Sequence, residues 1–109
     1  MTQNFAKFAE MIAKHVMNDE VWSQTVYSPS DIKKFTVIKV DNKRNWIMVG
    51  DPRTYLVTIR PDEGKISANG INQNIVEVIF ANAVEKSAKI CGIKLKKVPS
   101  HFSVIWEIL

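Results

Sequence analysis

The chain has 109 residues, of which 46% are hydrophobic and 24% charged, with a net charge of +4. This length and composition fit one globular domain, residues 1–109, and exclude intrinsic disorder, because a disordered chain has too little hydrophobicity to form a core. A single cysteine, Cys91, excludes an intrachain disulfide, and charges interrupt the first 20 residues, which argues against a signal peptide or membrane span. We therefore expect a cytoplasmic protein with no membrane partner.

An amphipathic helix is expected first, over residues 4–18. Phe5, Phe8, Ile12 and Val16 recur at intervals of three and four, which places them on one helical face. Val21 and Trp22 could extend this helix, and a short turn over residues 31–34 follows. From residue 35 the period changes to two, which predicts an antiparallel meander of four strands. The strands are expected over residues 35–40, 45–50, 54–60 and 65–70.

A second helix is expected from Asn74, where Asn74 and Glu77 match a capping box. Its apolar residues, among them Ile79 and Phe80, share one face, and Gly92 occupies the position of a left-handed C-terminal residue. Two strands follow, over residues 93–98 and 101–109. The order α-β-β-β-β-α-β-β predicts an α+β fold, with an antiparallel sheet of five or six strands and two helices.

The pattern of small and apolar residues in the second part of the chain includes Gly64-x-Ile66, Gly70 and Gly92-Ile93-x-Leu95 around the second helix. With this pattern, residues 35–109 resemble the double-wing domain of phage middle-promoter transcription activators. Residues 1–34 lie outside the resemblance and are too few for the winged-helix domain of those activators. The resemblance implies a sheet face that contacts DNA, but no individual DNA-contacting residue can be transferred from it.

Residue types that support catalysis are sparse. His15 and His101 are the only histidines, and neither belongs to a nucleophile-histidine-carboxylate or metal-ligand pattern. We therefore expect no enzyme activity, no metal, no cofactor and no small-molecule ligand. His15 is interpreted as a half-buried histidine bonded to a neighbour, and Cys91 as a small core residue. A hidden ribonuclease site and a reactive Cys91 thiol remain the alternatives.

Basic residues concentrate in residues 31–60, which hold seven Lys or Arg against three Asp. Basic side chains beside an aromatic residue are typical of surfaces that bind phosphates and stack bases. Edge-strand lysines that prevent sheet-to-sheet pairing, and solvated turns, are the alternative explanation. The candidate nucleic-acid-binding residues are Lys33, Lys34, Lys43, Arg44, Trp46, Arg53, Lys94 and Lys96.

Two classes of function follow from these observations. The first is a small nucleic-acid-binding or transcription-regulating module, with DNA favoured over RNA and with phage origin possible, in which case it acts in the host cytoplasm. The second is a protein-binding accessory factor or inhibitor, of the kind phages direct against a host enzyme, without catalysis of its own. The salt dependence of nucleic-acid binding separates the two classes.

Overall fold

The computed structural model describes residues 5–24, 36–51, 55–101 and 103–109. The helices are α1 (Phe5–Met17), α2 (Glu20–Gln24), α3 (Gln73–Ile75) and α4 (Ala81–Cys91), and a π-helical segment, η2 (Val76–Phe80), joins α3 to α4. The strands are β1 (Thr36–Asp41), β2 (Trp46–Asp51), β3 (Tyr55–Arg60), β4 (Lys65–Gly70), β5 (Leu95–Val98) and β6 (Val104–Ile108), and a 3-10 turn, η1 (Pro61–Glu63), connects β3 to β4.

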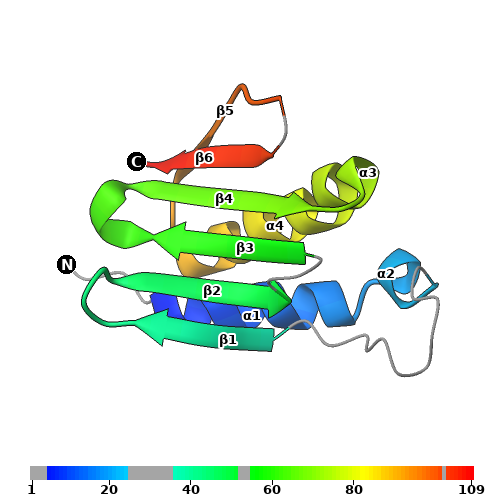
Figure 1. Cartoon of the computed structure of the whole chain (residues 1–109), viewed down its shortest axis with the longest axis horizontal. Helices are drawn as coiled ribbons and strands as arrows, with labels where there is room; N and C mark the ends of the chain where they lie inside the picture. The colour runs from blue at the N-terminus through cyan, green and yellow to red at the C-terminus, as the bar shows by residue number, and fades with distance from the viewer. Residues whose placement is uncertain (1–4, 25–35, 52–54, 102) are drawn as a thin grey trace.

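The six strands form one antiparallel sheet in the order β1-β2-β3-β4-β6-β5. The expected α+β fold and its order of elements are confirmed, with the short helix α2 as an addition. In the described part of the chain the long helices α1 and α4 lie on the same face of the sheet (Figure 1). The last strand, β6, lies between β4 and β5, so β1 and β5 are the edges.

The core lies between this helical layer and the sheet. Phe8, Ile12 and Val16 of α1 are fully buried, as their spacing predicted. On the sheet, alternate residues of β2, β3, β4 and β6 face the helices, and Trp106 of β6 is 1% exposed. Because burying one large apolar side chain contributes about 1.5–3 kcal/mol, this two-layer core supplies most of the favourable free energy of folding.

The helical run from Gln73 to Cys91 differs from expectation at its start. The N-cap is Asn72, whose side chain accepts a hydrogen bond from the backbone N–H of Asn74 at 3.0 Å. The capping box predicted at Asn74 is therefore wrong: Asn74 already lies inside the helix, and Glu77 instead accepts a bond from the Gln73 side chain. At the other end Gly92 has the expected left-handed conformation, with φ of 71°.

The first helix stops before Trp22 rather than extending through it. Asp19 caps a separate helix, α2, by accepting a hydrogen bond from the Trp22 backbone N–H at 3.0 Å. The Trp22 ring then packs against Phe80 of η2 and Tyr55 of β3, with ring centroids 5.5 and 5.4 Å away. This aromatic cluster fixes α2 against the helix-facing side of the sheet.

Some predictions fall outside the described residues. They are the turn over residues 31–34 and the candidate site residues Lys33, Lys34 and Arg53. Within the described ranges, no helix is long and apolar enough to cross a membrane.

Candidate functional site

The sheet face opposite α1 and α4 carries two parallel rows of side chains. Each row runs across the strands, because residues paired between neighbouring strands lie side by side on one face. We define the charged row as Asp41, Trp46, Arg60, Lys65, Glu107 and Lys96. Asp41 pairs with Trp46, Arg60 with Lys65, Lys65 with Glu107, and Glu107 with Lys96. The neutral row beside it consists of Met48, Thr58, Ser67, Ile105 and Val98, which also pair in sequence across the strands.

The charged row brings three cations from three strands to one end of the sheet. Arg60 ends β3, Lys65 begins β4 and Lys96 belongs to β5. Within the described residues none of these three side chains forms an ion pair. From β2 to β5 the row crosses four strand spacings of about 4.8 Å, or about 19 Å in total. It is therefore long enough to meet several phosphates of one polyanion.

Trp46 is held in a fixed position within this row. The guanidinium carbons of Arg44 and Arg60 lie 5.0 and 4.4 Å from the centre of its ring, which are cation–π distances. Its Nε1 donates a hydrogen bond to Glu63 Oε2 at 2.7 Å. Trp46 is half-buried, because two arginines and a carboxylate of η1 surround its ring.

The hairpin between β1 and β2 is rigidly built. Asp41 Oδ1 accepts hydrogen bonds from the backbone N–H groups of Lys43 and Arg44, at 3.1 and 3.2 Å. Asn45, with φ of 55°, donates from its side chain to Asp62 at 2.9 Å, which ties the hairpin to η1. These contacts fix the backbone from which Arg44 projects, while Lys43 remains exposed at the tip.

The predicted basic residues fall into two separated groups. Lys43, Arg44 and Trp46 lie at the β1–β2 hairpin, whereas Lys94 and Lys96 lie at the β5 edge, across β3, β4 and β6. Both groups are at the same end of the sheet, where the C-terminus also lies (Figure 1): the Leu109 backbone N–H donates to the Lys94 carbonyl at 2.9 Å. The two groups do not touch.

Arg60 and Lys65 join these two groups, and neither is among the candidate residues predicted from the sequence. They flank the η1 turn and are the last residue of β3 and the first of β4. The signal available in the sequence was their position on either side of the turn, which would pair them in a simple hairpin. Glu63 and Glu107 were also omitted, and both add negative charge to this end of the sheet.

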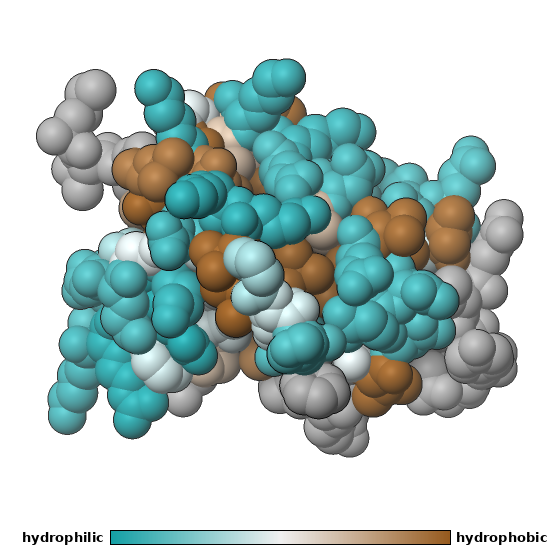
Figure 2. All heavy atoms as spheres, turned by 90° about the horizontal axis from the view of Figure 1, so that it is seen from above, coloured by the Kyte–Doolittle hydropathy of each residue, from teal (hydrophilic) through white to brown (hydrophobic). Residues whose placement is uncertain are grey.

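The lysines of the β5 edge are equally consistent with protection of this edge against pairing with another sheet. Lys96 and Lys97 are exposed on an edge strand of four residues, and Lys97 lies 3.4 Å from Glu85 of α4. Figure 2, which looks onto this edge, shows hydrophilic side chains over much of the surface with hydrophobic residues between them. Short, lysine-bearing edge strands resist pairing with another sheet.

His15 lies on the other side of the molecule, in the helical layer. Its Nδ1 is 2.8 Å from Ser87 Oγ of α4, which confirms the interpretation of a half-buried histidine bonded to a neighbour. Burial, together with the nearby positive charges of Lys86 and Lys14, lowers the pKa of His15 below 6.5. Ser87 is fully buried, so this pair presents no accessible nucleophile.

Cys91 and Trp106 take packing positions. Cys91 is half-buried against the core, with Sγ 3.5 Å from Met11 Sδ. Trp106 donates from Nε1 to Glu85 Oε1 at 3.4 Å, which satisfies its polar atom at the core boundary. In the described ranges no group of three or more His, Cys, Asp or Glu side chains could hold a metal ion.

Comparison with known proteins adds no assignment: no family model, no curated protein and no solved structure matches this chain.

Proposed function

We propose that the protein is a small nucleic-acid-binding module, with a role in regulating transcription, that uses the sheet face bearing the charged row. The observation that carries this proposal is the alignment of Arg60, Lys65 and Lys96 at one end of the sheet, with Arg44 held against Trp46 beside them. Arg60, Lys65 and Lys96 form no ion pair within the described residues, although Glu107 lies between Lys65 and Lys96 in the register and Arg44 pairs with Asp41 at 3.9 Å, and cations free of ion pairs are available to phosphates.

The resemblance of residues 35–109 to the double-wing domain of phage activators supports the same use of a sheet face and favours DNA over RNA. Such a module would act in the cytoplasm, that of the host if a phage encodes the chain. The carboxylates of Asp41 and Glu107 within the row limit its net charge. We therefore expect moderate, strongly salt-dependent affinity.

The test is fluorescence anisotropy of labelled duplex DNA, single-stranded DNA and RNA at several salt concentrations. Each lost phosphate contact reduces the slope of log K against log salt by about 0.9 on duplex DNA, so Lys65→Gln/Lys96→Gln should reduce it by about 2. The matched control is Lys14→Gln/Lys89→Gln, which removes the same charge from exposed positions on α1 and α4. This control should leave the slope nearly unchanged.

Two outcomes would refute the proposal. One is the absence of binding tighter than about millimolar to any of the three nucleic acids at low salt, which is weaker than ordinary non-specific binding. The other is an equal change of slope in both double variants, which would mean that only net charge matters. In either case the protein-binding accessory factor or inhibitor becomes the leading hypothesis, and stoichiometric co-purification with a cellular protein tests it.

A further inference from the structure

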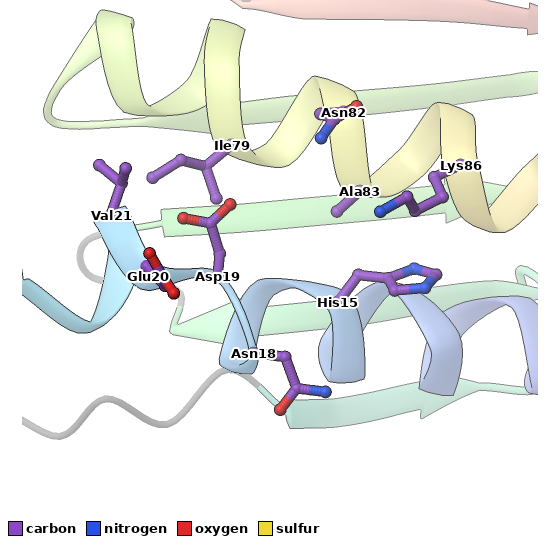
Figure 3. A pocket seen from close by; sticks show the side chains of 9 residues that line it. All are labelled: His15, Asn18, Asp19, Glu20, Val21, Ile79, Asn82, Ala83 and Lys86. Atoms are coloured by element: carbon purple, nitrogen blue, oxygen red, sulfur yellow. The ribbon is translucent and has the colours of Figure 1, made fainter.

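A second concave site lies in the helical layer, away from the charged row. A hollow of about 370 Å³ opens between the α1–α2 segment on one side and η2 and α4 on the other (Figure 3). This volume is in the range of small-molecule sites. Ile79 and Ala83 line it and are almost fully buried, at 3% and 4% exposure, so its floor is apolar.

The two ends of this hollow carry opposite charge. Asp19 and Glu20 lie at the end formed by α2, and Figure 3 shows the Asp19 carboxylate directed toward Ile79. One Asp19 oxygen, Oδ1, caps α2, which leaves Oδ2 for a ligand. Lys86 lies at the other end beside His15, and its ammonium has no ion-pair partner in the part of the chain that the structure describes.

The sequence separation along the helix gives the axial separation of Ile79 and Lys86, the helical residues at these two ends. Asp19 faces Ile79, and Lys86 follows Ile79 by seven residues on one continuous helical run, or about 10 Å at 1.5 Å per residue. An extended peptide spans at most about 3.3–3.6 Å per residue, so three residues cover the same length. A ligand of tripeptide length therefore matches the axial separation of Ile79 and Lys86.

We propose that this hollow binds a zwitterionic ligand of tripeptide length, with its ammonium at Asp19 and its carboxylate at Lys86. Ile79 and Ala83 contact the middle of the ligand, and the exposed Asn82 side chain, which also lines the hollow, bonds to a peptide group. The π-helical segment supports the site, since it carries Ile79 into the floor and such segments often occur where a helix serves a function.

His15 provides a readout that a purely structural role would not give. Burial lowers its pKa most, and Lys86 of α4 and Lys14 of α1 lower it further, while Asp19 and Glu20 face the hollow from the α2 side. A carboxylate placed beside Lys86 offsets that positive charge. The pKa of His15 should therefore change when the ligand binds, raised by the carboxylate and lowered by added burial, and NMR titration of the imidazole protons measures this change.

The experiment follows backbone amide and His15 shifts during titration with trialanine. Trialanine should bind with a Kd of about 1 mM or tighter, whereas N-acetylated trialanine, trialanine amide and free alanine should each bind at least about tenfold more weakly, since each lacks a charge-assisted contact. Two results overturn the proposal: no saturable shift at residues of the hollow up to about 10 mM, or equal affinity for the free and capped peptides.

Substitutions assign the two ends. Lys86→Gln should weaken trialanine binding by about tenfold and leave the binding of trialanine amide unaffected. Asp19→Asn should weaken trialanine binding by about tenfold and leave the binding of N-acetylated trialanine unaffected. Asn retains the cap of α2, so this variant should keep its fold. Lys89→Gln, about one helical turn from Lys86 and outside the hollow, is the charge-matched control. If Lys89→Gln and Lys86→Gln weaken binding equally, the carboxylate does not bind at Lys86 and the proposal fails.

Discussion

Replacing Phe80 by alanine should destabilise the protein more than almost any other single change. Phe80 belongs to η2, is completely buried, and contacts the rings of Trp22 and Tyr55, with centroids 5.5 and 5.2 Å away. The Ala side chain would leave a cavity between η2, α2 and β3, which these three elements can close only by moving toward one another. The Trp22 ring of α2 would keep its contact with Tyr55 of β3 but lose its contact with Phe80, which weakens the attachment of this short helix.

The magnitude follows from the contacts. Truncation of a buried Phe costs about 3–5 kcal/mol, which includes both the lost burial and the cavity. Each of the two aromatic contacts adds about 0.5–1.5 kcal/mol beyond its buried area, so we expect the upper part of that range. A domain of this size unfolds with about 5–15 kcal/mol, and the variant would therefore be marginally stable.

Urea unfolding followed by circular dichroism gives the free energy of unfolding for Phe80→Ala and for Val78→Ala. Val78 lies two residues away in the same segment but is 66% exposed, so its truncation should change the free energy by no more than about 0.5 kcal/mol. A Phe80→Ala loss below about 1 kcal/mol, or losses of equal size in both variants, would refute the assigned packing of η2.

Three further predictions concern pH, the helix end and the charged row. Because the pKa of His15 is lowered in the folded state, the unfolded chain binds more protons, so the free energy of unfolding should fall as pH drops through 6.5. His15→Gln should abolish this pH dependence, and His101→Gln should not. Gly92→Ala should cost about 1–2 kcal/mol in urea melts through left-handed backbone strain alone, since the added Cβ would meet nothing within 4 Å, and an unchanged midpoint would contradict this. If the charged row binds nucleic acid, Glu63→Gln should tighten nucleic-acid binding at low salt, because it removes a negative charge while Gln still accepts the Trp46 hydrogen bond. Weaker binding would argue that Glu63 serves only to fix Trp46.

The basic and aromatic residues at this end of the sheet could be predicted from the sequence only in part. Lys43, Arg44, Trp46 and Lys96 were recognisable as basic or aromatic residues at turns and edges, but the sequence could not show that β6 inserts between β4 and β5. Without that strand order, the positions of Lys65 and Lys96 relative to each other on the sheet are undefined. The state of Trp46 was equally hidden, because its half-burial depends on Glu63, 17 residues later in the chain.

The sequence by itself determined the type and order of the elements and which residues form the core. Alternation in β4 and the spacing of Phe8, Ile12 and Val16 are local patterns, and each reflects directly which side of a strand or helix is buried. Only the tertiary structure decided the strand order, the alignment of the charged row, and the hollow beside His15, whose partner Ser87 is 72 residues away. These features depend on pairings between distant segments, which are selected by the packing free energy of the whole domain and leave no periodic trace in the chain.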